Sequence, residues 1–222
     1  MKMKKFKLKA AIFDLDGTLL DSMMVWRSLT EAYLKGKGIE PEKDLSFKLL
    51  GKSSEFQSNY VYEKYGIKTT PDQVYQETIP YIKNYYAEIA EPKPGIFEFL
   101  DLLKSNNIPC AIATATPLQL MESALDKFGF KKYFKVVITT YDVGVGKHKP
   151  DIYETAVSRL NADKAATVIF EDALYAVKTL KKHNFNCCVI ADNISEPDPE
   201  PIKAVSDMYI ENWFEAPVLF EF

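Results

Sequence analysis

The chain has 222 residues, of which 47% are hydrophobic and 27% are charged, and its formal net charge at pH 7 is −3. This composition predicts a folded globular protein, because it supplies enough apolar side chains for a buried core. The net negative charge gives no reason to expect nucleic acid as a partner, and no apolar stretch reaches the roughly 20 residues that span a membrane. We therefore expect a small-molecule partner.

The chain begins with five lysines among its first nine residues. Such a start resembles the basic region of a signal peptide, but Asp14 soon interrupts the apolar run that follows, so no export signal is expected. The three cysteines, Cys110, Cys187 and Cys188, show neither a disulfide framework nor the Cys-x-x-Cys spacing of a metal site. They lie in apolar runs, which predicts that they are buried, and they suit a reducing compartment. We expect a cytoplasmic protein.

The first predicted strand, residues 10–13, leads directly into the sequence Asp-Leu-Asp-Gly-Thr. Residues two apart in an extended chain point to the same side, so Asp14 and Asp16 should emerge together at the carboxyl edge of a sheet, where open α/β sheets bind ligands. Two carboxylates this close resist joint ionisation unless a cation or hydrogen bonds compensate, which predicts a bound metal. The alternative is an ordinary strand end with two solvated acids. A calcium loop is excluded, because Thr18 and Val25 occupy two positions that need acids.

Nearly a hundred residues separate this strand from the next one, far more than one crossover helix needs, so an insertion is expected. Helical spacing of apolar residues predicts helices over residues 25–35, 42–50, 54–65 and 72–90. We assign residues 22–91 to a small helical domain. The proline-rich stretch from residue 91 to residue 95 suits a hinge.

Strand-like and helix-like segments alternate in the rest of the chain. Short runs rich in branched residues predict strands at residues 108–114, 136–140, 167–170, 186–190 and 208–210. Helices are expected at residues 117–128, 150–160 and 173–183. This alternation indicates an α/β fold with a parallel sheet. Residues 192–201 form an acidic, proline-rich loop to which we assign no chemistry.

Polar residues stand at or after the ends of two of these strands. Thr114 ends one strand, and Thr116 followed by Pro117 is typical of an N-cap with proline at the first helical position. A hydroxyl group beside a helix N-terminus is suited to binding phosphate, although a threonine can also simply end a strand. Lys147 lies in a glycine-rich loop and could bring a positive charge to a phosphoryl group, with Lys149 as the competing candidate.

Two acids, Glu171 and Asp172, directly follow a third strand. Their carboxylate oxygens are hard ligands suited to magnesium. The alternative is a helix start, where acidic side chains interact favourably with the helix dipole. Because the carboxyl ends of parallel strands meet at one edge of a sheet, we expect these acids to lie near the first acid pair.

In this order, the four motifs resemble those of the haloacid dehalogenase superfamily, in particular its phosphatases and phosphomutases with a helical cap inserted after the first motif. The resemblance covers nearly the whole chain and includes enzymes similar to β-phosphoglucomutase and phosphoglycolate phosphatase. It implies a Rossmann-like parallel sheet core, residues 1–21 and 92–222, and an all-helical cap, residues 22–91. The matching residues are Asp14 to Thr18, then Thr114, then Lys147, and finally Glu171 with Asp172.

The third motif of relatives often reads Gly-Lys-Pro-x-Pro-Asp, and laying it over residues 146–151 selects Lys147 rather than Lys149. His148 stands where relatives have proline. Ala173 and Ala176 stand where many relatives have serine and glycine. These departures leave the acids of the site untouched.

The resemblance implies a magnesium-dependent phosphatase that hydrolyses a small phosphomonoester. Asp14 would attack phosphorus to form an aspartyl-phosphate, and Asp16 would protonate the leaving oxygen and then activate water. Thr114 and Lys147 would hold phosphoryl oxygens, so that Lys147 serves both binding and catalysis. The implied Mg²⁺ ligands are Asp14, Asp16 through its backbone carbonyl, Asp172, and Glu171 directly or through water.

Other functions use similar residues. A sugar phosphomutase similar to β-phosphoglucomutase is the closest rival, because it would use the same side chains. A dehalogenase is disfavoured, since attack on carbon needs no second acid and Asp16 is present. A non-catalytic phosphoacceptor would lack the cap, and a binding protein with a relic site would not need every charged group that is present.

The polar joint Gly51-Lys52-Ser53-Ser54 lies between predicted cap helices. Lys52 is our candidate for a contact with the substrate, because loops often carry specificity; a plain solvated turn is the alternative. The expected partner is a small phosphorylated metabolite, with neither nucleic acid nor membrane involved, and we expect a monomer.

Overall fold

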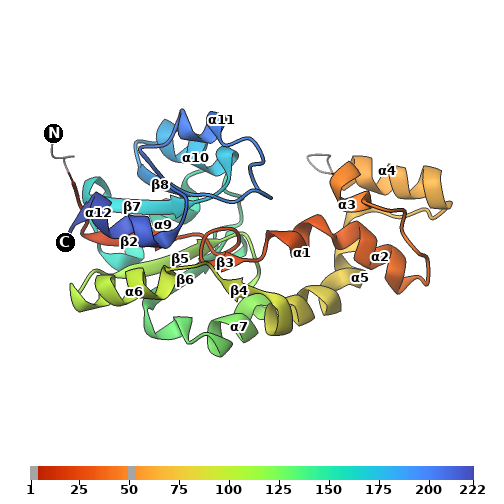
Figure 1. Ribbon diagram of the computed structural model, residues 1–222, viewed down its shortest axis with the longest axis horizontal. Helices are drawn as coiled ribbons and strands as arrows, with labels where there is room; N and C mark the ends of the chain where they lie inside the picture. The colour runs from red at the N-terminus through yellow and green to blue at the C-terminus, as the bar shows by residue number, and fades with distance from the viewer. Residues whose placement is uncertain (1–4, 50–53) are drawn as a thin grey trace. The chain divides into compact units, whose positions relative to one another are not determined.

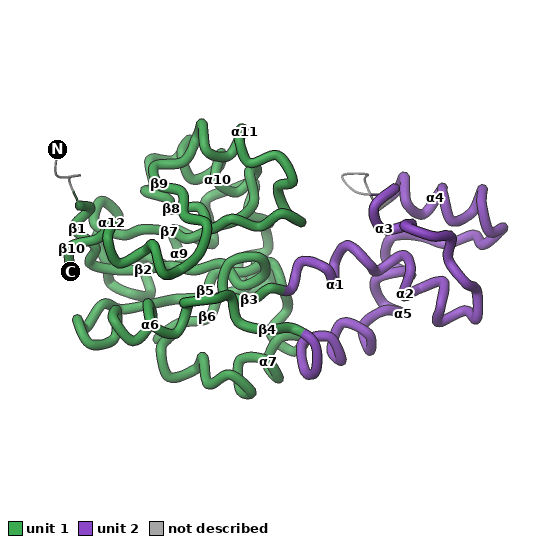
Figure 2. The backbone as a smooth tube through the Cα atoms, viewed as in Figure 1, with its two compact units in different colours: residues 1–21, 90–222 green, residues 22–89 purple. Residues whose placement is uncertain are grey.

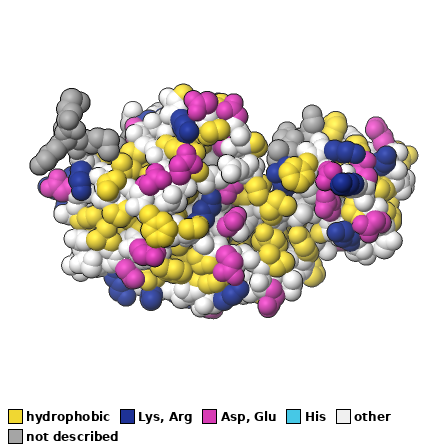
Figure 3. Space-filling model, in the orientation of Figure 1, with side chains coloured by type: hydrophobic (Ala, Val, Ile, Leu, Met, Phe, Trp, Pro, Cys, Tyr) yellow, Lys and Arg dark blue, Asp and Glu magenta, His cyan; other side chains and the backbone are white. Residues whose placement is uncertain are grey.

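The computed structural model of the chain describes residues 5–49 and 54–222. The chain divides into two compact units, one formed by residues 1–21 and 90–222 and the other by residues 22–89 (Figure 2). Acidic and basic side chains are interspersed on the visible face of each unit (Figure 3). None of the helices in the described part of the chain is both long and apolar enough to cross a membrane.

The first unit is built around a six-stranded sheet in which all neighbouring strands run parallel, in the order β6-β5-β2-β7-β8-β9 (Figure 1). The predicted α/β fold with a parallel sheet is therefore confirmed. β2, β5 and β7 are buried along their whole length, and β8 is buried except at its first residue. The interior residues of these four strands are apolar, as expected for strands covered on both faces. The strands are β2 (Ala10–Phe13), β5 (Cys110–Thr114), β6 (Phe134–Thr139), β7 (Thr167–Glu171), β8 (Asn186–Ile190) and β9 (Met208–Ile210).

Helices follow the strands of this sheet. The three predicted helices are present as α7, α9 and α10 with slightly shifted ends, whereas α6, α8, α11 and α12 were not predicted. The short helix α8 begins with a capping box between Thr139 and Asp142. The α-helices of the unit are α6 (Ile96–Ser105), α7 (Leu118–Lys127), α8 (Thr140–Val143), α9 (Asp151–Leu160), α10 (Leu174–Lys182), α11 (Glu200–Lys203) and α12 (Ala216–Leu219). The short 3₁₀ helices in the described part of this unit are η2 (Phe130–Lys132), η3 (Lys164–Ala166) and η4 (Trp213–Glu215).

Successive residues of the central strand β2 point to opposite faces of the sheet. Ile12 belongs to a buried cluster that includes apolar residues of α9 and α10. Phe13 stacks on Phe170, with ring centroids 4.7 Å apart, and also contacts Phe99 of α6 and Trp213 of η4. Because both faces are covered by large apolar side chains, the ends of β2 and its neighbours are held rigidly in place.

Two small two-stranded sheets, which were not predicted, complete the described part of this unit. β1 (Phe6–Lys7) pairs in parallel with β10 (Phe220–Glu221), and β3 (Leu20–Asp21) pairs antiparallel with β4 (Glu91–Pro92). The start of the proline-rich stretch therefore forms a strand. The three cysteines are free and buried, as predicted, and burial raises the pKa of Cys110 and of Cys187 to about 12.

All elements described in the second unit are helical. Its buried core contains Tyr33, Leu34, Leu45, Leu49 and Val61. Lys52, the candidate substrate contact, lies outside the described residues. The helices are α1 (Met23–Arg27), α2 (Leu29–Gly36), α3 (Leu45–Lys48), α4 (Ser54–Tyr65), α5 (Pro71–Asn84) and the π-helix η1 (Tyr85–Ile89).

Candidate active site

The candidate site lies at the carboxyl edge of the central sheet. Asp14 directly follows β2, while Glu171 ends β7 and Asp172 follows it. β2 and β7 are parallel neighbours with Phe13 opposite Phe170, and the backbone N–H of Asp14 donates to the carbonyl oxygen of Phe170 at 2.9 Å. This register brings the acids of the first and fourth motifs to adjacent strand ends.

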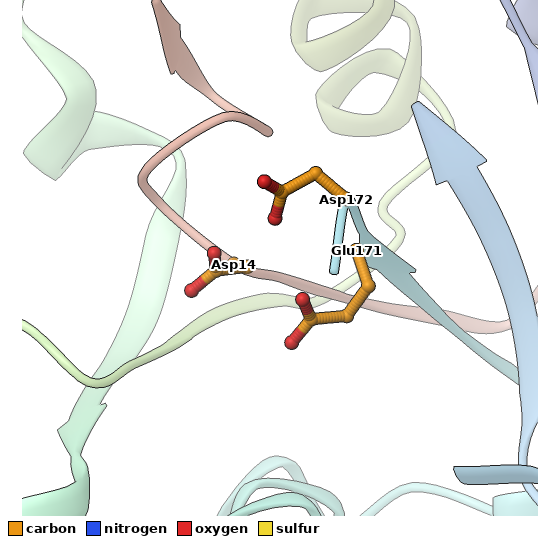
Figure 4. Close-up of side chains that lie close together, drawn as sticks. All are labelled: Asp14, Glu171 and Asp172. Atoms are coloured by element: carbon orange, nitrogen blue, oxygen red, sulfur yellow. The ribbon is translucent and has the colours of Figure 1, made fainter. Parts of the chain in front are cut away.

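Three acids, Asp14, Glu171 and Asp172, converge at this edge. Each offers one carboxylate oxygen, and these oxygens lie within 4.8 Å of one another. Figure 4 shows the three carboxyl groups facing a common space. All three side chains are buried, with residue exposures of 7%, 1% and 3%. Such crowding of buried like charges is unfavourable unless positive charge or hydrogen bonds compensate it.

Burial, together with the neighbouring charges, raises the pKa of two of these acids. Burial is the largest influence on Asp14 and raises its pKa to about 7; Lys147 opposes the rise, and the charges of Glu171 and Asp16 add to it. Burial, followed by the charges of Asp14 and Glu171, raises the pKa of Asp172 well above its usual range. Both acids would therefore be stabilised in their ionised form by a nearby cation.

Lys147 reaches this cluster from the loop between α8 and α9. Its ammonium group donates hydrogen bonds to Oδ1 of Asp14 and, at 2.6 Å, to Oε1 of Glu171. Burial alone would lower the pKa of Lys147, but the charges of Asp14 and Glu171 outweigh it and the net shift is upward. Lys149, the competing candidate, is exposed. The structure thus brings Lys147 into contact with the first motif.

The two oxygens of Glu171 have different surroundings. Oε1 accepts hydrogen bonds from Lys147 and, at 2.7 Å, from the hydroxyl group of Tyr153 on α9. Oε2 is buried and has no hydrogen-bond partner among the described residues. A buried carboxylate oxygen without a partner is costly, so this atom is suited to accept a ligand that is not part of the chain.

The residues of the cluster fit a divalent metal ion. Three buried carboxylates face one another, and the single positive charge of Lys147, which contacts two of them, does not balance all three. Hard carboxylate oxygens are the ligands that Mg²⁺ prefers, and a cation there would engage the unpartnered Oε2 of Glu171 either directly or through water. The donor set therefore suits Mg²⁺ better than a softer metal.

Asp16 lies beside this cluster and is also buried. Its Oδ2 accepts a hydrogen bond from the hydroxyl group of Thr116 at 2.5 Å. The interpretation of Thr116 as an N-cap was therefore wrong. The helix α7 begins at Leu118, its N-cap residue is Pro117, and no side chain caps it. The hydroxyl group of Thr116 points to Asp16 instead, because the end of β5 brings it to the same sheet edge.

Thr114, the last residue of β5, is fully buried at this edge. Its Oγ1 accepts a hydrogen bond from the backbone N–H of Thr116 at 3.0 Å. A hydroxyl oxygen that accepts in this way keeps its own hydrogen for another acceptor. The side chain is thus equipped to donate to an oxyanion at the edge of the sheet.

Asp172 has partners that the sequence did not reveal. Its Oδ2 accepts a hydrogen bond from the hydroxyl group of Ser195, and its Oδ1 lies 3.5 Å from the hydroxyl group of Thr18. Ser195 belongs to the loop after β8, to which no chemistry was assigned. Because β8 is the parallel neighbour of β7, the loop after β8 starts at the same edge of the sheet as Asp172. The position of Ser195 shortly after a predicted strand was therefore the signal in the sequence that could have indicated this contact.

Comparisons with known proteins show which family the chain belongs to. Residues 8–184 match the family of haloacid dehalogenase-like hydrolases. The phosphorylated carbohydrates phosphatase of Thermotoga maritima is 28% identical over 174 residues, which are 78% of this chain and 81% of that protein. The validoxylamine A 7′-phosphate phosphatase of Streptomyces hygroscopicus subsp. limoneus is 29% identical over 180 residues, which are 81% of this chain and 84% of that protein.

Solved structures show the same fold. The crystal structure of CbbY from Rhodobacter sphaeroides in complex with phosphate aligns with a TM-score of 0.76 and 21% identity, and the alignment covers 96% of this chain and 99% of that chain. The family match spans most of the chain, from the residues before Asp14 to those beyond Asp172. The expected family is thereby confirmed: the chain belongs to the haloacid dehalogenase-like hydrolases.

Proposed function

We propose that the protein is a magnesium-dependent phosphatase that hydrolyses a small phosphomonoester through an aspartyl-phosphate intermediate. The observation that carries this proposal is the convergence of Asp14, Glu171 and Asp172 around one space, with Lys147 bonded to two of them. The relatives named above, which are phosphatases of phosphorylated carbohydrates and of validoxylamine A 7′-phosphate, support a carbohydrate-like phosphoester as the substrate.

Asp14 would be the nucleophile. Lys147 binds its Oδ1, which leaves Oδ2 to attack phosphorus. A bond would form between this oxygen and phosphorus while the bond from phosphorus to the leaving oxygen breaks. The covalent step divides one difficult displacement into two easier ones.

Asp16 would be the general acid and base. It would give a proton to the leaving oxygen, and in the second step it would take a proton from the water that attacks the aspartyl-phosphate. The hydrogen bond from Thr116 to Oδ2 would hold the carboxyl group in one orientation during both transfers. Water attack would then regenerate Asp14 and release inorganic phosphate.

Lys147 and Thr114 would hold the phosphoryl oxygens. The ammonium group of Lys147 has three N–H donors, and two of them bond Asp14 and Glu171. The third would be available to the phosphoryl group, and Thr114 would supply a hydroxyl donor from the end of β5. The helical unit, residues 22–89, would be the cap domain of the enzyme.

We assign the metal to the carboxylates of Asp14 and Asp172, the backbone carbonyl of Asp16, and Glu171 directly or through water. When bound, Mg²⁺ would offset the negative charge that gathers around the phosphoryl group. The buried Oε2 of Glu171 supports this assignment, because none of the described residues satisfies it.

The test is phosphate release from a panel of sugar phosphates, nucleotides and other small phosphoesters, with Mg²⁺ and with a chelator, using the wild-type protein and Asp14→Asn. We expect release that needs Mg²⁺ and that falls by about 10⁴-fold or more in Asp14→Asn, as for other nucleophile deletions. Appreciable turnover by Asp14→Asn would exclude Asp14 as the nucleophile. Interconversion of sugar phosphates without phosphate release would instead identify a phosphomutase.

A further inference from the structure

Two adjacent residues of the loop after β8 make contacts near the candidate metal site. Ser195 contacts the acid Asp172, and Glu196 contacts the start of the helix α10. Ser195 donates its hydroxyl hydrogen to Oδ2 of Asp172. Glu196 accepts a hydrogen bond through Oε1 from the backbone N–H of Leu174, the first residue of α10, at 2.7 Å. The segment from Asp172 to Leu174 is therefore held at both ends by two adjacent residues of one loop.

The loop itself is held by Asp192. Its Oδ1 accepts hydrogen bonds from the backbone N–H groups of Ile194 and Ser195, both at 2.9 Å. A carboxylate that accepts from the chain two and three residues ahead closes a tight turn and restricts the conformations of the residues within it. The backbone at Ser195 is thus held by a side chain three residues earlier.

Asp192 is anchored in turn by Lys93, a residue distant in the sequence. The Lys93 ammonium lies 2.9 Å from Oδ2 of Asp192 and donates to the carbonyl oxygen of Ala191 at 2.6 Å. Their side chains are 11% and 4% exposed, so water screens the ion pair little. The two oxygens of Asp192 thus have different partners, because Oδ1 closes the turn while Oδ2 is held by Lys93.

We propose that Ser195 is a positioning residue for Asp172, held in place by the Asp192 turn, and that this chain of contacts sets the affinity of the metal site. The hydroxyl group of Ser195 engages Oδ2 of Asp172 and thereby restricts the orientation of this carboxyl group beside Asp14 and Glu171. Partners that hold a metal-binding carboxylate typically contribute a factor of about 10 to 100 to metal affinity. The inference rests on the metal assignment of the proposed function.

The test measures binding of Mn²⁺, as a paramagnetic stand-in for Mg²⁺, from the electron paramagnetic resonance signal of the free ion, without substrate. We expect Ser195→Ala to bind Mn²⁺ about 10 to 100-fold more weakly than wild-type protein, and Ser195→Thr, which keeps the hydroxyl group, to restore most of the affinity. The matched control is Ser206→Ala, because the hydroxyl group of the half-buried Ser206 donates to the carbonyl oxygen of Lys203 rather than to an acid of the candidate site. The Mn²⁺ affinity of this variant should equal that of wild-type protein.

A second variant tests the turn independently of the Ser195 side chain. Asp192→Ala should also weaken Mn²⁺ binding, and the double variant with Ser195→Ala should lose less than the two single losses combined, because both act through one contact. Asp192→Asn keeps Oδ1 as an acceptor and should lose less affinity than Asp192→Ala. Each protein is measured after circular dichroism has shown the wild-type fold.

The outcomes separate this inference from the proposed function. If wild-type protein binds Mn²⁺ and both Ser195→Ala and Asp192→Ala bind it equally well, the positioning role is wrong and the metal site stands. If the wild-type protein does not bind Mn²⁺, the metal assignment fails and the inference fails with it. A loss of stability in Ser195→Ala at unchanged Mn²⁺ affinity would reduce Ser195 to a structural residue.

Discussion

The hydroxyl group of Thr116 donates a hydrogen bond to Oδ2 of Asp16 at 2.5 Å, across a separation of 100 positions in the sequence. Asp16 follows β2 and Thr116 follows β5, which are parallel neighbours in the sheet. The bond fixes one oxygen of the proposed acid and base, and it joins the second motif to the first. In the proposed reaction, Thr116 would therefore act by holding the carboxyl group of Asp16.

Replacing Thr116 by Val keeps the shape of the side chain but removes this donor. A hydrogen bond to a charged group is worth about 1.5–3 kcal/mol, so we expect kcat to fall by about 10 to 100-fold. The KM for the substrate should change little, because Asp16 acts in the chemical steps. Steady-state kinetics of Thr116→Val and of Thr116→Ser, which keeps the hydroxyl group, measures this; equal rates for wild-type protein and Thr116→Val would contradict it.

Replacing Asp16 by Asn removes the proton carrier while leaving a side chain of similar size. We expect kcat to fall by about 10² to 10⁴-fold, the range that general acid and base catalysis contributes, with substrate binding retained. A rapid-quench experiment with labelled substrate follows both steps. Since Asp16 acts in both, a variant that formed and hydrolysed the intermediate at wild-type rates would remove Asp16 from the mechanism.

Lys147 and Lys149 offer a contrast between a buried and an exposed lysine in one loop. Lys147→Met leaves Asp14 and Glu171 without their shared cation, and loss of one partner of a buried ion pair costs about 3–5 kcal/mol. Lys149→Ala should change the free energy of unfolding by less than about 0.5 kcal/mol, because Lys149 is exposed. Urea titrations in the presence of a chelator measure both values.

The same two lysines should differ in their effect on phosphatase activity. Lys147→Met should abolish turnover and Lys149→Ala should retain it. If Lys149→Ala were inactive while Lys147→Ala kept the full rate, the assignment of the third motif would have to be reversed.

Mg²⁺ should stabilise the folded protein, because the cation offsets the repulsion among Asp14, Glu171 and Asp172. At a Mg²⁺ concentration of about 100 times its Kd, binding adds about 2.7 kcal/mol to the free energy of unfolding. Thermal melts at rising Mg²⁺ concentration measure the shift in Tm, with NaCl at equal ionic strength as the control. Asp172→Asn should reduce the shift, whereas Asp126→Asn, an exposed acid on α7, should not. An equal shift in Asp172→Asn would place the ion elsewhere.

Much of this molecule could be predicted from local patterns. The runs at residues 10–13, 167–170 and 186–190 predict the central strands closely, since a strand covered on both faces is a short, continuous apolar run. Asp14, Glu171 and Asp172 stand next to strand ends in the sequence, and parallel strands end at a common edge. Their convergence was therefore a consequence of the predicted topology.

The helix α6 was missed although its buried residues Ile96, Phe99, Leu100 and Leu103 follow helical spacing. Other missed elements lack such a pattern. The strand pairs β1 with β10 and β3 with β4 are only two residues long on each strand, so periodicity cannot reveal them. The helix α8 has only four residues, and it follows β6 without a break. In both cases pairing or capping by neighbouring residues, rather than an apolar repeat, stabilises the element.

The sequence by itself determined the α/β class, the order of the four motifs and the set of acids at the sheet edge, because each depends on local spacing along the chain. Only the tertiary structure decided which atoms meet: Thr116 with Asp16, Tyr153 with Glu171, and Ser195 with Asp172. These contacts join residues that are far apart in the sequence, and their geometry depends on the register of the strands and on how the loops at their ends are held. Local spacing carries no information about either.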